Sequence, residues 1–258
     1  MSKNAATLRA TDLWAGEGMH DVVRGVSLEL TTGDAPVGII GESGVGKSTL
    51  VRALLGLLRP SHGTVTWDGR TASKLGRRDK KVFRSRVARV SQNGLVDIDT
   101  RDTVARALTR ALDTARKAGR ASSRTVPELI DLAALEPRHA ERKIHSLSGG
   151  EKQRLAIAAA LAPRPDVLIL DEPLSAVDPA MRGEVARRLA TVAETEGTAL
   201  LVVTHDLELV ERLCPTVHVL ADGEFVASGS LREVFARSEH PSVRGLAEAA
   251  PLAAQRFR

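Results

Sequence analysis

The 258-residue sequence contains no tyrosine, and aromatic residues of all kinds make up only 2% of it. Proteins that bind single-stranded nucleic acid commonly stack the bases on aromatic side chains. The composition therefore argues against a base-stacking surface. The formal net charge of +5, from 37 basic and 32 acidic residues, is a mild excess that tolerates anionic partners but does not demand them.

The chain has a single cysteine, Cys214, so an internal disulfide framework is excluded. No apolar run at the N-terminus resembles a signal peptide. No segment approaches the roughly 20 consecutive apolar residues that a membrane-spanning helix needs. We therefore expect a protein of the reducing cytosol, which would need a partner for any role at a membrane.

The pattern of apolar residues predicts an α/β fold in a single domain over 1–258. An apolar run at 37–40 precedes a helical pattern over 47–58, which stops near Arg59-Pro60. The expected core covers about 5–92 and 162–230, the helical subdomain about 93–161, and a C-terminal segment 231–258. The later β-rich runs are Val167–Leu170, Ala199–Val203 and Val217–Leu220, with helical segments at Met181–Glu194 and Leu207–Leu213.

The segment Gly41–Ser48, GESGVGKS, matches the full phosphate-loop pattern between a predicted strand and a predicted helix. Its glycines let backbone N–H groups point at phosphate oxygens, and the helix N-terminus attracts the same anion. Lys47 would reach the β- and γ-phosphates, Ser48 would supply an oxygen to Mg²⁺, and Thr49 would add a hydroxyl contact. The predicted nucleotide-binding residues here are Gly41, Glu42, Ser43, Gly44, Val45, Gly46, Lys47, Ser48 and Thr49.

Two carboxylates follow the run at 167–170, which has the composition of a strand buried on both faces. Asp171 would hold Mg²⁺ directly or through water. Glu172 would polarise the water that attacks the γ-phosphate. A polar turn after a strand is the structural alternative, but the complete phosphate loop in the same chain favours the catalytic interpretation.

The segment Leu147–Glu151, LSGGE, has two interpretations. Ser148 and Glu151 have the S-x-x-E spacing of a helix capping box, which is a structural feature. Two glycines inside the cap weaken that interpretation, because glycine is costly in a helix but permits close approach to an anion. Since the chain already has one phosphate cradle, a second one indicates a phosphate approached from a second molecule. The predicted contacts are Leu147, Ser148, Gly149, Gly150 and Glu151.

Together these motifs resemble the nucleotide-binding subunits of ABC transporters over nearly the whole chain. The family order also includes a D-loop at Ser175–Asp178 and a switch histidine in Thr204-His205-Asp206. The resemblance implies a P-loop NTPase core of the ABC type, with an N-terminal antiparallel β-subdomain and an inserted helical subdomain. It also implies an ATPase that uses ATP and Mg²⁺, with each ATP enclosed between the phosphate loop of one subunit and the LSGGE signature of another.

By position, the resemblance assigns three further residues. His205 would contact the γ-phosphate and act beside the catalytic Glu172. Gln92 matches the Q-loop glutamine, which would belong to the catalytic set, ligate Mg²⁺ and report the nucleotide state to a membrane partner. Asp178 would lie across the dimer interface and link the two nucleotide sites.

Two departures from the family pattern concern the nucleotide base and the Q-loop. Family members usually stack adenine on an aromatic residue before the phosphate loop, but Trp14 lies several positions too early. Met19 or His20 would have to replace it. The neighbours of Gln92, which are Ser91 and Asn93-Gly94, also differ from the usual pattern, so contacts to the membrane partner are expected to be unusual.

The segment His240–Pro251 is similar to one found in the ATPases of oligopeptide, dipeptide and nickel importers, and so is Gly41–Gly44. On this resemblance we expect solute transport, as peptide or nickel uptake, at the cytoplasmic face of the membrane. The implied partners are transmembrane permease subunits and, indirectly, a solute-binding protein. A second ATPase subunit would complete a homodimer or a heterodimer, and no nucleic-acid partner is expected.

Other classes of protein stay open. A soluble ABC ATPase could serve DNA repair, translation or a phosphonate-degrading complex, and a P-loop small-molecule kinase would leave Leu147–Glu151 unexplained. The basic run Arg77–Arg89 is also open to two interpretations. It is either a solvated surface, as charge runs usually are, or a contact with lipid headgroups or a membrane partner.

Overall fold

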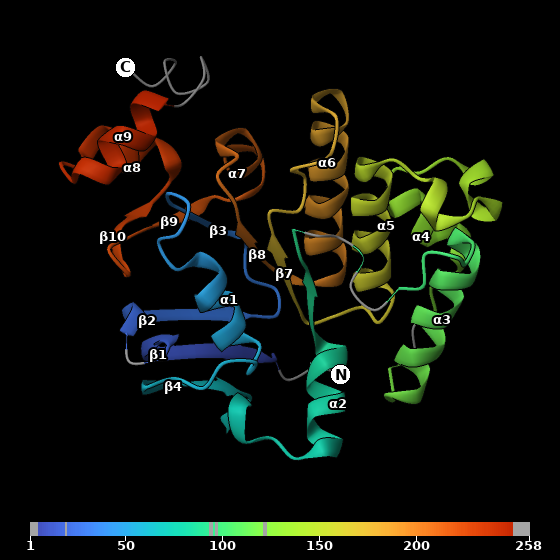
Figure 1. Cartoon of the computed structure of the whole chain (residues 1–258), viewed down its shortest axis with the longest axis horizontal. Helices are drawn as coiled ribbons and strands as arrows, with labels where there is room; N and C mark the ends of the chain where they lie inside the picture. Colours follow the sequence, from blue (N-terminus) through green and yellow to red (C-terminus); the bar gives the residue numbers. More distant parts are fainter. Residues whose placement is uncertain (1–4, 19, 93–94, 96–97, 121–122, 250–258) are drawn as a thin grey trace.

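The computed structural model describes residues 5–18, 20–92, 95, 98–120 and 123–249. Two β-sheets lie next to each other with helices packed around them, and a group of helices extends to one side (Figure 1). No helix among the described residues is long and apolar enough to cross a membrane.

A six-stranded sheet forms the centre of the core, with the strand order β10-β9-β3-β8-β7-β6. All neighbouring strands pair in parallel except β10, which pairs antiparallel with β9. Every residue of β8 and all but the last of β7 are buried, which is why both read as continuous apolar runs. The strands are β3 (Val37–Ile40), β6 (Val87–Val90), β7 (Val167–Asp171), β8 (Ala199–Val203), β9 (Thr216–Ala221) and β10 (Glu224–Gly229).

A four-stranded antiparallel sheet, ordered β2-β1-β4-β5, confirms the expected N-terminal β-subdomain. Helix α1 (Lys47–Leu54) joins the two sheets, because Leu50 and Leu54 share one buried cluster with Leu13 of β1 and Ile39 of β3. This packing fixes the start of α1 next to the end of β3. The strands are β1 (Thr7–Glu17), β2 (His20–Thr31), β4 (His62–Trp67) and β5 (Arg70–Thr71).

Helices α3 (Val104–Lys117), α4 (Val126–Leu132) and α5 (Gly149–Leu161) form the group at the right of Figure 1. Short 3₁₀ helices η2 (Pro137–Glu141) and η3 (Ile144–Ser146) lead into α5. Two arginines of the α3–α4 connection fasten this group to the core. Arg120 lies 3.1 Å from Asp166, and Arg124 pairs with Glu196 while donating to the carbonyl of Leu161.

The remaining helices differ from the sequence pattern mainly at their ends. Helix α1 stops at Leu54 instead of 58, because the chain turns at Gly56, where φ is 64°. Helix α6 begins at Pro179, two residues before the predicted start, since proline suits the first helical position and Asp178 caps it. The others are η1 (Ala72–Lys74), α2 (Arg77–Arg86), α7 (Leu207–Leu213), α8 (Leu231–Arg237) and α9 (Pro241–Ala249).

Helix α2 was not expected from the sequence, which showed only a run of basic residues. The helix buries Phe83 against Trp67 of β4, with ring centroids 6.0 Å apart. Its basic side chains consequently point outward. Pro251, at the end of the segment compared with importer ATPases, lies outside the described residues.

Candidate active site

Loops that follow four neighbouring strands meet at one edge of the six-stranded sheet. Strands β3, β8, β7 and β6 are adjacent and parallel, so their carboxyl ends lie at the same edge. This topology brings together segments that are far apart in the sequence. The predicted residues at this edge are the phosphate loop Gly41–Ser48 after β3, Gln92 after β6, Asp171 and Glu172 at the end of β7, and His205 after β8.

The phosphate loop owes its tight curl to two glycines with positive φ, Gly44 at 88° and Gly46 at 108°. A third glycine, Gly41, permits close packing, because a Cβ there would lie 2.3 Å from the carbonyl oxygen of Leu220. The Lys47 ammonium group donates to the carbonyls of Gly41 and Glu42, both at 2.7 Å. No side chain caps α1, and its first turn holds no acidic residue, so the backbone N–H groups there are suited to an anion.

Opposite charges share the space beside this loop. Burial lowers the pKa of Lys47, although the negative charges of Glu172, Asp171 and Glu42 act in the opposite direction. Burial also raises the pKa of Asp171, and the negative charge of Glu172 raises it further. The positive charges of Arg89 and Lys47 oppose this increase. Two partly buried carboxylates beside a single ammonium group, with oxygen as the donor atom, suit a hard divalent cation such as Mg²⁺.

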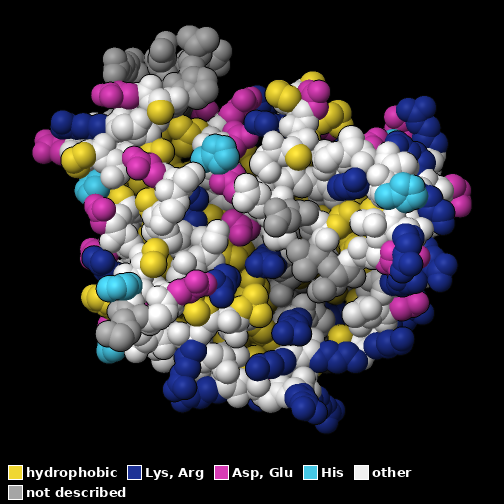
Figure 2. Space-filling view, viewed as in Figure 1, with side chains coloured by type: hydrophobic (Ala, Val, Ile, Leu, Met, Phe, Trp, Pro, Cys, Tyr) yellow, Lys and Arg dark blue, Asp and Glu magenta, His cyan; other side chains and the backbone are white. Residues whose placement is uncertain are grey.

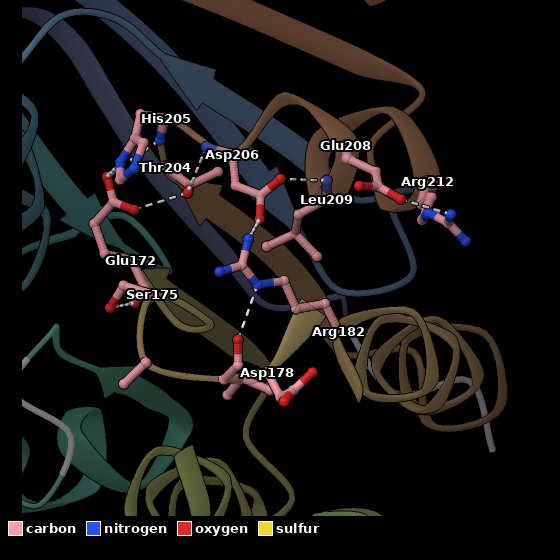
Figure 3. A network of polar contacts seen from close by, with 12 residues as sticks. Glu172, Ser175, Asp178, Arg182, Thr204, His205, Asp206, Glu208, Leu209 and Arg212 are labelled. Carbon is pink, nitrogen blue, oxygen red and sulfur yellow. Dashed lines mark hydrogen bonds and ion pairs between the residues drawn. The ribbon is translucent and has the colours of Figure 1, made fainter. Parts of the chain in front are cut away.

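The Glu172 carboxylate is held by the loop that follows β8 (Figure 3). Thr204 donates its hydroxyl to Oε2 at 2.8 Å, and the backbone N–H of His205 donates to Oε1 at 3.1 Å. The Nδ1 atom of His205 lies 2.8 Å from the same Oε1. The His205 side chain is 68% exposed while that of Glu172 is 12% exposed, so the imidazole covers the carboxylate from the solvent side.

Glu172 also adopts an uncommon backbone conformation. Its φ is 51°, which is strained for a residue with a side chain, and its N–H donates to the carbonyl of Val203 at 2.8 Å. The hydrogen bonds from Thr204 and His205 keep the carboxylate in one orientation. A fixed, partly buried carboxylate at the site edge can accept a proton from water.

The segment Leu147–Glu151 forms a capping box at the start of α5. The Ser148 hydroxyl accepts from the N–H of Glu151 at 3.2 Å, and Glu151 accepts from the N–H of Ser148 at 2.7 Å. Glu151 also contacts His139 at 2.9 Å and Arg142 at 3.2 Å. Burial would raise the pKa of Glu151, but the Ser148 and His139 hydrogen bonds and the Arg142 charge lower it to about 2. The Leu147 side chain is buried in the core.

This segment does not complete the site of its own chain. Within the described part of the chain, no hydrogen bond or ion pair joins 147–151 to 41–49. Gly150 instead packs on the D-loop, where a Cβ would lie 2.8 Å from the carbonyl oxygen of Ala176. Ser148 is exposed, and because its hydroxyl accepts from Glu151, it keeps its proton for a further acceptor.

The other predicted positions are less closely joined to the site. Gln92 is exposed, and Asp178 accepts from the N–H of Ala180 at 2.9 Å as the cap of α6.

His20 is exposed at the start of β2, while Met19 and Asn93-Gly94 lie outside the described residues. The Trp14 indole donates to Asp12 at 3.2 Å. The residue that contacts the base therefore stays a prediction.

Two polar residues at this edge were missed in the sequence. Gln153 of α5 is 2% exposed, and its helical spacing to the buried Ala156 and Ile157 was the available signal. Arg182 of α6 donates to the carbonyl of Val177 and to Asp206, both at 3.0 Å (Figure 3). No sequence pattern pointed to Arg182, because an arginine on an exposed helix is ordinary.

Comparison with known proteins gives related sequences. Residues 23–175 match the family model described as ABC transporter. The chain is 38% identical over 231 residues to the nickel import ATP-binding protein NikE of Rhodospirillum rubrum, covering 88% of this chain and 82% of that protein. It is 35% identical over 232 residues to the glutathione import ATP-binding protein GsiA of Salmonella paratyphi A, covering 90% of this chain and 37% of that protein.

Solved structures of the same fold are also similar. One is the ATP-binding cassette MJ0796 as a dimer in a post-hydrolysis state with ADP and Pi, with a TM-score of 0.74, 26% identity, and 86% of this chain and 98% of that chain covered. Another is cbiO1 of Clostridium perfringens, part of the ABC transporter complex cbiONQ, with a TM-score of 0.75, 25% identity, and 97% and 98% covered. The chain therefore belongs to the ABC transporter family, as an ATP-binding and ATP-hydrolysing subunit.

Proposed function

We propose that this chain powers solute import as one of two ATPase subunits that enclose two ATP molecules between them. The observation that carries the proposal is an incomplete site. The phosphate loop, both carboxylates and His205 converge at one sheet edge, while Leu147–Glu151 presents its serine hydroxyl without touching that loop. A second subunit would supply the missing segment, and the dimeric cassette MJ0796 supports this arrangement.

In the proposed site, backbone N–H groups of the phosphate loop and the start of α1 bind the phosphates. Lys47 would leave the carbonyls of Gly41 and Glu42 for phosphate oxygens, which are stronger acceptors because they are charged. Ser48, Asp171 and Gln92 would hold Mg²⁺, which neutralises phosphate charge when bound. From the other subunit, Leu147–Glu151 would reach the γ-phosphate through the Ser148 hydroxyl, and Asp178 would lie at the interface.

For hydrolysis, Glu172 is the proposed base and His205 its partner. The carboxylate would take a proton from the attacking water, in an orientation fixed by Thr204 and by the backbone N–H of His205. His205 would reach the γ-phosphate from its exposed position beside Oε1. Tighter binding of ATP than of ADP by the closed dimer would supply the work of transport.

Sequence similarity supports nickel or peptide uptake as the transported class. NikE and GsiA are named for nickel and glutathione import, and glutathione is a small peptide. The importer-like segment after His240 folds as α9, which packs through Val243 onto the main core. The cassette would act at the cytoplasmic face of the membrane through permease subunits, with a solute-binding protein as an indirect partner.

The proposed binding site for the permease is a groove of about 920 Å³ between α2, β6, α3 and α5. Basic side chains gather along the lower part of the molecule, over α2 and the neighbouring helices (Figure 2). Arg77, Lys80 and Arg84 line the groove on one side, and Arg110 lines it on the other. Because Ser91 lines the groove and precedes Gln92 in the chain, a segment bound there would sense the nucleotide site. We therefore interpret the basic run as a partner surface.

The paired-site proposal is tested by two substitutions in the purified cassette, without permease subunits. Glu172→Gln should lower ATP hydrolysis by about 10²- to 10⁴-fold and hold the cassettes together in ATP, seen as an increased mass by light scattering. Ser148→Arg should prevent the increase in mass in ATP, because the signature segment could no longer bind the partner's ATP. Unchanged turnover in Glu172→Gln would remove the proposed base. Full activity in Ser148→Arg would favour a site completed within one chain.

The importer assignment is tested by capturing the tagged chain from detergent-solubilised membranes and identifying the proteins that accompany it. Arg84→Glu should reduce recovery of the permease by about tenfold, because a charge at the groove is reversed. Arg187→Glu, an exposed arginine of α6, is the matched control and should recover it normally. Capture of soluble proteins without any permease would favour a non-transport complex such as phosphonate degradation.

A further inference from the structure

Gln153 lies where the helical group meets the catalytic edge of the sheet. It belongs to α5, two residues after the signature segment Leu147–Glu151, and only 2% of it is exposed. Burying a primary amide is costly unless its donors and its acceptor find partners. The partners of Gln153 come from two loops that border the ATP site, the one after β7, which holds Glu172 and the D-loop, and the one after β6, which holds Gln92.

The contacts of this amide define its orientation. Its Oε1 accepts from the N–H of Ala176 at 2.9 Å. Its Nε2 donates to the Ser175 hydroxyl at 2.9 Å and to the carbonyl of Glu172 at 3.1 Å, and lies 3.5 Å from the carbonyl of Gln92. A backbone N–H requires the oxygen and backbone carbonyls require the NH₂ group, so the reverse orientation is excluded.

The D-loop is therefore fixed to α5 along its backbone. Ala176 is held by the Gln153 amide, and its carbonyl lies against Gly150, where a Cβ would approach to 2.8 Å. A shift of the first turns of α5 would have to carry the D-loop with it. Since Gln153 also binds the Glu172 carbonyl, the same shift would act on the peptide that carries the catalytic carboxylate.

The opposite flank of the D-loop leads to the same carboxylate (Figure 3). Arg182 joins the Val177 carbonyl to Asp206. The N–H of Asp206 donates to the Thr204 hydroxyl at 3.0 Å, and that hydroxyl donates to Glu172. The D-loop is thus connected to Glu172 from both sides, by Gln153 at its start and by Arg182 at its end.

We propose that Gln153 is a positioning residue that couples the signature segment of a subunit to the catalytic Glu172 of the same subunit. The inference rests on the proposed two-subunit site, in which these two elements serve different ATP molecules. Leu147–Glu151 binds the ATP held by the partner, while Glu172 acts on the ATP held by its own phosphate loop. Gln153 therefore links the two ATP sites through a single buried side chain.

The test replaces the amide by an apolar chain of similar length and measures cooperativity. Gln153→Met should lower kcat by about tenfold and reduce the Hill coefficient for ATP from about 2 to about 1, with little change in ATP binding to the isolated cassette. Leu155→Met, on the same buried helix but away from the D-loop, is the control for altered packing. It should keep the wild-type Hill coefficient.

A second variant covers the possibility that Gln153→Met folds poorly. Ser175→Ala removes one partner of the amide at an exposed position, and it should lower the Hill coefficient in the same direction. In the double variant the two effects should be non-additive, because both changes act on one contact. A full Hill coefficient in Gln153→Met or in Ser175→Ala overturns the inference. If the wild-type complex itself shows no cooperativity and no ATP-driven dimer, the two-subunit proposal fails instead.

Discussion

The close packing of α5 on the D-loop gives a quantitative prediction for the two glycines of the signature segment. Adding a methyl group at Gly150 places a Cβ 2.8 Å from the carbonyl oxygen of Ala176 and 3.2 Å from the Cα of Val177. Both neighbours are backbone atoms, and the Gln153 amide holds Ala176 in place. At Gly149 the same methyl group meets only the Cβ of Ala176, at 3.4 Å, which is an ordinary contact.

The expected free energies differ in sign. Overpacking of this kind costs about 1 to 3 kcal/mol. Replacing glycine by alanine in a helix stabilises the folded state by up to about 1 kcal/mol, because alanine loses less backbone entropy on folding. We therefore expect Gly150→Ala to lower the free energy of unfolding by about 1 to 2 kcal/mol. Gly149→Ala should leave it unchanged or raise it slightly. Neither glycine has a positive φ, so backbone strain does not enter the comparison.

The assay is urea unfolding of the nucleotide-free chain, followed by circular dichroism, with both variants compared with wild type under identical conditions. The two glycines are adjacent in the same helical turn, so differences in the unfolded state largely cancel. If Gly150→Ala were as stable as Gly149→Ala, the close approach of α5 to the D-loop would be wrong. Gln153 would then not transmit movement between α5 and the D-loop.

Two further predictions concern titratable groups. Burial raises the pKa of the Cys214 thiol to about 12 from an ordinary value near 9.0, so its thiolate fraction at pH 8 falls about a thousandfold. A thiol reagent should therefore label Cys214 only after unfolding. Rapid labelling of the native chain would contradict its burial. Burial and Glu172 raise the pKa of Asp171, so its ionisation disfavours folding once the pH rises above its unfolded pKa, with the full cost above its folded pKa. Asp171→Asn should therefore be more stable than wild type at pH 7 without Mg²⁺ and nucleotide, and this advantage should vanish at acidic pH; an advantage that persists there would have another cause.

The sequence predicted most of the core because its signals are local. The apolar runs at 167–170 and 199–203 are strands of the central sheet, and Asp222-Gly223 connects β9 to β10. Helix ends were less predictable, since Gly56 stops α1 through a turn set by its neighbours. Helix α2 was missed because its apolar side consists of little more than Phe83, whose partner Trp67 lies in strand β4 of the four-stranded sheet.

The sequence by itself determined the family and the chemical groups, because Gly41–Ser48, Leu147–Glu151 and Asp171-Glu172 are short motifs whose spacing carries their chemistry. Only the tertiary structure decided how these groups are connected. The hydrogen bonds of His205 to Glu172, and of Gln153 to the loops after β6 and β7, join residues distant in the chain through the parallel strand order and the packing of α5. The helical spacing of Gln153 to Ala156 and Ile157 indicates a buried position, but a single sequence does not show which distant groups meet the amide there.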